Sequence, residues 1–180
     1  MHSPTPKAAW LLAPALAVAC GLGLAQVERL DLAQMVSRTD GAVAGTIVGS
    51  EVIRVDHPVD GPELYFTSLL VRGTSLYTGL DETVAVTFAG GFVSPDEGVH
   101  NSEAPSADET RAGNRVVVFY KYEPNMGGDV SGNALYAAHG GLYRVVSTRR
   151  GDVVLGRGDG YAVSSNLTLA DLRGRITTLR

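Results

Sequence analysis

The stretch that decides the fold is "AVAGTIVGSEVIRV", residues 42–55. It is rich in β-branched residues, which favour strands because they pack well on a pleated surface. Gly45 and Gly49 interrupt it, and glycines inside a strand are typical of bulges or of barrel corners where two backbones approach closely. The stretch therefore predicts one long, bent strand in a β-barrel.

The stretches that follow also have the patterns of strands and turns. "HPVDGPE" (57–63) has the Pro and Asp-Gly chemistry of a turn, so residues 42–55 are expected to pair with a strand at 64–72. "ETVAVTFAGG" (82–91) alternates apolar and smaller or polar residues with a period of two. "RVVVFYKY" (115–122) is apolar at nearly every position, as expected of a central strand covered on both faces. Two further strands are predicted in "ALYAAHGGLYRVV" and "DVVLGRG", the first broken at "HGG".

Capping signals predict a helix near each end of this β-rich region. Asp31 with Gln34 three residues later forms a capping box, and Thr168 with Asp171 repeats the spacing. We therefore predict an all-β fold: a five-stranded barrel of the oligonucleotide/oligosaccharide-binding (OB) type, with short helices near residues 31–38 and 168–176. A β-sandwich is the alternative.

The first 25 residues have the features of a signal peptide. A short cationic start precedes the apolar run "AAWLLAPALAVACGLGLA", which is too short and too interrupted for a membrane span. Cleavage after Ala25 predicts a secreted or periplasmic protein, in which residues 26–180 form a single OB-like domain. Cleavage before Cys20 would instead give a lipoprotein that is lipidated at Cys20 and anchored at the cell envelope.

The order of these patterns resembles two groups of exported proteins. "DGAVAGTIVGSEV", "LYFTSLLVRG" and "RAGNRVVVFYKYE" are similar to stretches of uncharacterised bacterial exported proteins. The layout over residues 30–147 is similar to the OB barrel of netrin-like domains and tissue inhibitors of metalloproteinases. Those inhibitors use a disulfide-tied amino-terminal cysteine, whereas Cys20 is the only cysteine here. Their mechanism and functional residues therefore do not carry over.

The sequence contains no recognisable set of catalytic or metal-binding residues. His57, His100 and His139 are far apart in the sequence, without the one-turn spacing of paired zinc ligands. Five acids lie near His100, but their spacing matches no calcium loop: Asp96, Glu97, Glu103, Asp108 and Glu109. The sequence has no nucleophile elbow and no phosphate-binding loop. We therefore predict no catalytic residue, cofactor or metal.

The polar segment at residues 92–113 completes the sequence-based picture. Its 22 residues include two prolines, two glycines and three serines, which predicts a loose, exposed connection rather than a site. With a formal net charge of −4 and an export signal, nucleic acid is not an expected partner. We predict an exported, non-enzymatic binding module for a protein or glycan, a secreted protease being one candidate. The alternative is a metal-dependent hydrolase that uses His100 and nearby acids.

Overall fold

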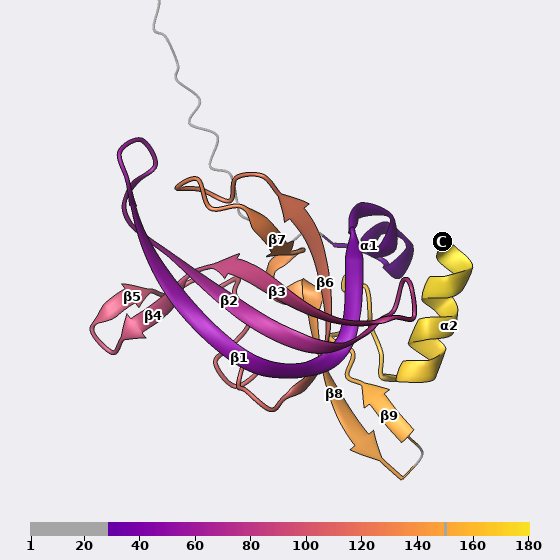
Figure 1. Cartoon of the computed structure of the whole chain (residues 1–180). Helices are drawn as coiled ribbons and strands as arrows, with labels where there is room; N and C mark the ends of the chain where they lie inside the picture. Colours follow the sequence, from indigo (N-terminus) through magenta and orange to yellow (C-terminus); the bar gives the residue numbers. More distant parts are fainter. Residues whose placement is uncertain (1–28, 150) are drawn as a thin grey trace, which may run out of the picture.

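A long, bent β-hairpin dominates the fold (Figure 1). The computed structural model describes residues 29–149 and 151–180. Strand β1 (Gly41–His57) pairs antiparallel with β2 (Gly61–Ser75), from Val43 opposite Ser75 to Val55 opposite Leu64 and on to the turn at 58–60. The predicted pairing of residues 42–55 with 64–72 is confirmed.

Two glycines face each other where this hairpin enters the barrel. Gly45 lies opposite Gly73, and a Cβ on Gly45 would lie 2.3 Å from the carbonyl oxygen of Arg72. A Cβ on Gly73 would likewise lie 2.1 Å from the carbonyl oxygen of Ala44. The register also shifts between Ile47 and Gly49, as a β-bulge does. The close backbone approach predicted from the glycines is confirmed.

The barrel closes through three more strands, β3 (Asp81–Ala89), β6 (Arg115–Glu123) and β7 (Gly132–Leu135). The order is β1-β2-β3-β7-β6, and β6 returns to pair with β1. All neighbours are antiparallel except β3 and β7, which run parallel and meet at Thr87 and Ala134. The fold is therefore the predicted five-stranded barrel and not the alternative sandwich.

Strand β6 separates two hydrophobic cores, which explains its continuous apolar run. Val116 and Val118 point into the barrel, whereas Val117 and Phe119 point outward beneath the helices; all four are fully buried. The barrel core is completed by residues of the other strands: Val43, Ile47, Leu69, Val71, Val84, Val86, Leu135 and Leu142. A strand buried on both faces needs apolar side chains at successive positions.

Both predicted helices are present, with the predicted caps. Helix α1 (Leu32–Arg38) begins after Asp31, whose carboxylate accepts from the Gln34 N–H at 2.8 Å, and the reciprocal capping-box bond is formed. Helix α2 (Leu169–Leu179) begins after Thr168, whose hydroxyl accepts from the Asp171 N–H. It runs three residues further than the predicted end at 176. Both helices contribute to the outer core through buried side chains: Met35, Val36, Leu172 and Ile176.

Outside the barrel the sheet continues beyond β6. A 3₁₀ turn, η1 (Ala138–Gly141), breaks the "HGG" stretch as expected, and β8 (Leu142–Thr148), β9 (Gly151–Val154) and β10 (Leu167–Thr168) follow. A separate hairpin of β4 (Gly91–Ser94) and β5 (Glu97–Val99) lies between β3 and β6 in the chain. Neither this hairpin nor β10 is predicted by the sequence patterns.

The predicted signal peptide lies outside the described residues, as do Cys20 and the cleavage position after Ala25. In the described part of the chain, no helix is both long enough and apolar enough to cross a membrane.

Candidate functional site

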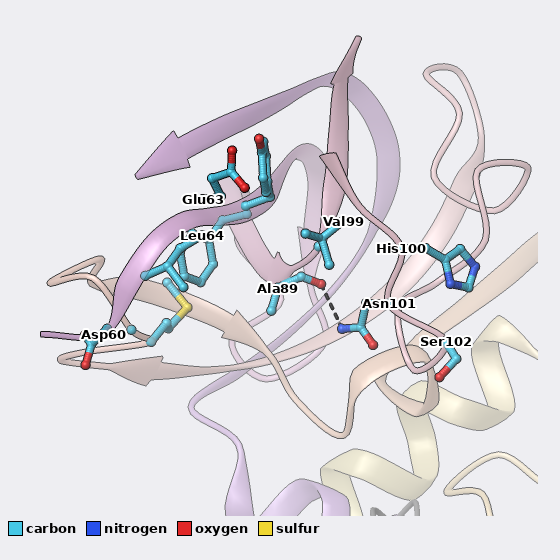
Figure 2. Close-up of a pocket in the computed structure, with 13 residues that line it drawn as sticks. Asp60, Glu63, Leu64, Ala89, Val99, His100, Asn101 and Ser102 are labelled. Atoms are coloured by element: carbon cyan, nitrogen blue, oxygen red, sulfur yellow. Dashed lines mark hydrogen bonds between the residues drawn. The ribbon is translucent and has the colours of Figure 1, made fainter. Parts of the chain in front are cut away.

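A cavity of about 540 Å³ lies at one end of the barrel, between the β1–β2 turn and the β6–β7 loop (Figure 2). We call it the end cavity. Its apolar lining comes from β2, β3, β5 and the β6–β7 loop: Leu64, Phe66, Ala89, Val99 and Met126. Its polar lining includes Asp60, Glu63, His100, Asn101 and Ser102. The cavity thus combines an apolar floor with two carboxylates at its margin.

Hydrogen bonds hold both sides of the end cavity in place. The Asp60 carboxylate accepts from the Gly128 N–H at 2.7 Å, which ties the β1–β2 turn to the β6–β7 loop. The Nε2 atom of His57 lies 3.3 Å from an Asp129 carboxylate oxygen across the same gap. On the other side, the Asn101 amide donates to the carbonyl oxygen of Ala89 at 2.9 Å (Figure 2). These contacts fix the relative positions of the segments that form the cavity.

Acidic side chains surround a single guanidinium beside this cavity. Arg54 lies 2.9 Å from Glu97, 3.3 Å from Asp56 and 3.5 Å from Glu63. Hydrogen bonds to Glu97 and Asp56 raise the pKa of Arg54 above its usual value. The pKa of Asp56 is lowered, chiefly by the Glu63 N–H and further by Arg54. Three carboxylates share one cation, so this side of the molecule stays negatively charged at neutral pH.

A second cavity, of about 560 Å³, lies on the other side of residues 99–102. We call it the loop cavity, because residues 104–107 and Thr110 form one of its walls. The opposite wall comes from the barrel strands and β4: Ser50, Val52, Thr67, Phe88, Gly91 and Phe92. Its lining contains no carboxylate and no lysine or arginine, so it is suited to uncharged side chains.

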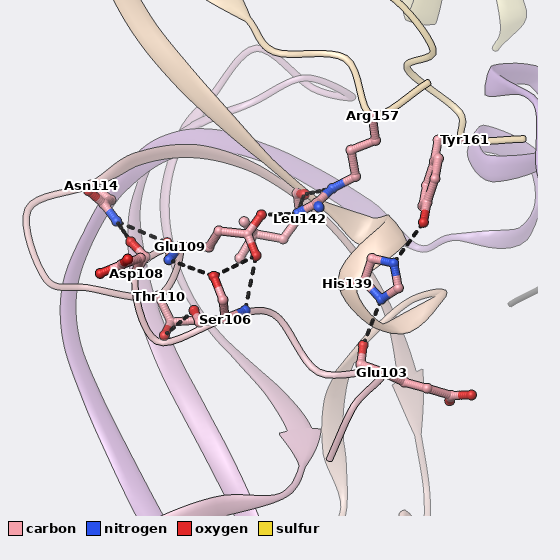
Figure 3. Close-up of polar contacts among 10 residues, drawn as sticks. All are labelled: Glu103, Ser106, Asp108, Glu109, Thr110, Asn114, His139, Leu142, Arg157 and Tyr161. Atoms are coloured by element: carbon pink, nitrogen blue, oxygen red, sulfur yellow. Dashed lines mark hydrogen bonds and ion pairs between the residues drawn. The ribbon is translucent and has the colours of Figure 1, made fainter. Parts of the chain in front are cut away.

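An ion pair holds residues 103–114, which include one wall of the loop cavity (Figure 3). The Arg157 guanidinium binds the Glu109 carboxylate, and the side chains of the pair are only 20% and 22% exposed. Arg157 also donates twice to the carbonyl oxygen of Leu142, at 2.9 and 3.0 Å. Glu109 in turn accepts from the N–H and hydroxyl of Ser106 at 2.9 and 3.0 Å. Burial alone raises the pKa of Glu109, but the Ser106 and Arg157 contacts outweigh it and leave this pKa below its usual value.

A histidine supplies the second attachment of the same wall. The backbone N–H of His139 donates to the carbonyl oxygen of Glu103 at 2.9 Å, and His139 Nδ1 lies 2.9 Å from the same oxygen. Its Nε2 atom lies 2.8 Å from the hydroxyl of Tyr161. Both ring nitrogens of His139 are therefore engaged in contacts between loops, an arrangement that serves structure rather than metal binding.

These contacts correct one part of the prediction for residues 92–113: the segment is mostly exposed, as predicted, but it is not without attachments. The segment instead forms the β4–β5 hairpin, buries Pro105 and is held by Glu109 and by the main chain of Glu103. The looseness was inferred from the composition of the segment alone, which carries no information on these attachments. The ordering cost is offset by partners at Arg157 and His139, far away in the sequence.

The histidines and acids considered for metal binding are not brought together. In Figure 2 the His100 ring lies at the outer margin of the end cavity, away from Asp60 and Glu63. Among the described residues, no group of three or more His, Cys, Asp or Glu side chains could hold a metal ion. Three of the five acids near His100 are paired with arginines instead: Glu97 with Arg54, Asp108 with Arg111, and Glu109 with Arg157. The hydrolase alternative thus gains no geometric support from the described residues.

Comparison of the chain with protein families, with curated proteins and with solved structures finds no match. The resemblance to netrin-like domains therefore stays a prediction from the sequence. Sequence patterns alone did not identify either cavity, because the walls of each come from several segments that are far apart in the sequence. The only local signal was the unusual length of the segment between β3 and β6.

Proposed function

We propose that this chain is an exported, non-enzymatic binding module that takes a segment of a partner protein into the end cavity. The observation that carries the proposal is the position of this cavity. It lies between the β1–β2 turn and the β6–β7 loop, over the ends of β2 and β3. Barrels of the OB type generally bind their ligands on this face, between the two corresponding loops.

The chemistry of the end cavity favours a protein segment that carries lysine or arginine. Long cationic side chains bury their methylene stems on apolar surface and keep the charged head in contact with carboxylates or water. Leu64, Met126 and Val99 offer such a surface, and Asp60 and Glu63 lie at its margin. A charge-assisted hydrogen bond to either carboxylate would then fix the orientation of the ligand.

A glycan is the less suitable partner. The two aromatic residues that line the end cavity, Tyr65 and Phe66, are only 6% and 3% exposed. Their rings are therefore not available for stacking on a sugar. A protein partner also agrees with the predicted export of the chain, and a secreted protease remains one candidate partner.

A capture experiment with matched variants tests the proposal. The tagged mature chain is used to pull down partners from the native secretome, and the captured protein is then titrated against the variants. Met126→Gln keeps the length of the side chain but places an amide against the methylene stem of the ligand, and it should weaken binding about tenfold, whereas Met126→Leu should keep it within about twofold. Equal binding by both variants would contradict the proposed site.

Metal analysis of the same preparation separates the binding module from the hydrolase alternative. We expect no stoichiometric zinc in the purified chain. Zinc at one equivalent, lost in His100→Ala together with a hydrolytic activity, would contradict the non-enzymatic function.

A further inference from the structure

We propose that the outer edge of β1, residues 49–56, is a docking site for an extended peptide of a partner protein, which adds to the sheet as a strand and places an apolar side chain in the loop cavity. This site is distinct from the end cavity. It uses the backbone of β1, the loop cavity and the acidic charge of the hairpin.

The first observation is an unpaired strand edge. Strand β1 pairs with β6 only from Gly41 to Thr46, and its last backbone contacts on that side join Ile47 to Asn114 and Gly113. Beyond Ile47, within the part of the chain that the structure describes, β1 has backbone pairing with β2 alone. Residues 49–56 therefore form a free strand edge, on which alternate residues present unpaired N–H and C=O groups as a template for another strand.

The register shows which residues of β1 point their backbone outward. The carbonyl oxygen of Tyr65 accepts from the Gly90 N–H at 2.7 Å, on the side of β2 that faces away from β1. Its partner across the β1–β2 ladder is Arg54. Because hydrogen-bonded and non-bonded pairs alternate in an antiparallel ladder, the backbone groups of Arg54 point away from β2. The same holds two and four residues earlier, at Val52 and Ser50.

The second observation is that the loop cavity lies on the matching face. Ser50 and Val52, whose backbone groups point outward, also line this cavity with their side chains. In an antiparallel pair, residues directly opposite each other point to the same face of the sheet. A peptide residue opposite Ser50 or Val52 would therefore direct its side chain to the loop cavity. The lining has no carboxylate, lysine or arginine and its surface is mostly apolar, which favours an apolar side chain.

The charge of the hairpin identifies the flanks of this peptide. Between residues 49 and 64 the chain carries four carboxylates, Glu51, Asp56, Asp60 and Glu63, against the one guanidinium of Arg54. Basic residues beside the apolar position would therefore be attracted. A second copy of this chain is the poorer occupant, because two such edges would bring like charges together.

The test uses a defined probe. It is a terminally blocked, fluorescently labelled peptide of seven residues, in which three valines alternate with two threonines between terminal lysines. We expect the full mature chain to bind it in an anisotropy titration. Its twin with terminal glutamates should bind at least about tenfold more weakly. No binding of the lysine peptide, or equal binding of both, would overturn the proposal.

Matched variants of an exposed edge residue test the strand addition itself. Ser50→Pro removes one outward N–H while leaving the β1–β2 ladder intact, since proline is tolerated where the N–H of an edge strand faces solvent. It should weaken peptide binding about tenfold with the melting temperature unchanged, and Ser50→Ala should bind within about twofold of the wild type. Equal binding by the proline variant would overturn the proposal.

A control on the peptide needs no change in the protein. N-methylation of the valine amides, or of the threonine amides in a second peptide, blocks hydrogen bonds on one edge of the strand only. Only one of these two peptides should lose binding, and loss or retention by both would overturn the proposal.

Two further outcomes separate this proposal from its alternatives. A concentration-dependent dimer that Ser50→Pro abolishes would assign the edge to a second copy instead. Met126→Gln changes no charge and should leave peptide binding within about twofold, so this inference and the proposed function fail independently.

Discussion

Removing the charge of Glu109 tests how residues 103–114, which form one wall of the loop cavity, are held. Glu109→Gln keeps the size of the side chain but ends the ion pair with Arg157. Breaking a buried pair costs about 3–5 kcal/mol, and an exposed pair contributes about 0–1 kcal/mol. With the two side chains 20% and 22% exposed, we expect a loss of about 2 kcal/mol in the free energy of unfolding.

The assay is urea unfolding at pH 7, followed by circular dichroism, with limited proteolysis of residues 101–114 as a second readout. Glu103→Gln is the matched control, because Glu103 holds the segment through its main chain and not through its carboxylate. We expect the control to cost less than about 0.5 kcal/mol. Faster cleavage within residues 101–114 should accompany only the Glu109 variant.

The same pair predicts a pH dependence. The pKa of Glu109 is below its usual value in the folded chain, so its stabilisation is present above the unfolded pKa of about 4.3. This stabilisation is lost as the pH falls through the lower, folded pKa. The difference between the wild type and Glu109→Gln should therefore shrink below about pH 4. Equal stability of the Glu109 and Glu103 variants at pH 7 would refute this account of the wall.

Three further substitutions, in the barrel, in α2 and in β8, probe the fold by thermal or urea unfolding. Gly45→Ala should lose about 2–3 kcal/mol, because its Cβ would meet the Arg72 carbonyl oxygen at 2.3 Å, and wild-type stability would disprove the close approach. Gly174→Ala, in open space on α2, should gain about 0.5–1 kcal/mol, and a loss there would contradict the helix. Tyr143→Phe should lose about 1–2 kcal/mol, because the Val163 N–H donates to its hydroxyl at 3.3 Å; an unchanged stability would show that this bond contributes little.

The barrel could be predicted because its signals are local. The glycines of residues 42–55, the turn at 57–63 and the N-caps at Asp31 and Thr168 each act over a few residues, and all three signals are found in the structure. The continuous apolar run of β6 predicted a strand covered on both faces, and it lies between the two cores. Local propensity and the tertiary fold agree at these positions.

The cavities could not be predicted because their walls depend on contacts across the sequence. Glu109 and Arg157 are 48 residues apart, and His139 and Glu103 are 36 residues apart. The composition of residues 92–113 predicted a loose segment. Composition reflects the free-energy cost of ordering the backbone, but it carries no information on distant residues whose contacts offset that cost. The β4–β5 hairpin was missed for a related reason: its two strands have only four and three residues.

Hydrogen–deuterium exchange of the chain, free and bound to the protein that it captures from the secretome, tests the central claim most directly. If the end cavity is the binding site, amide exchange should slow over residues 60–66, 99–102 and 126–128 and stay unchanged in α2. Slower exchange confined to α2 or to β8 and β9, with these three segments unchanged, would contradict the account.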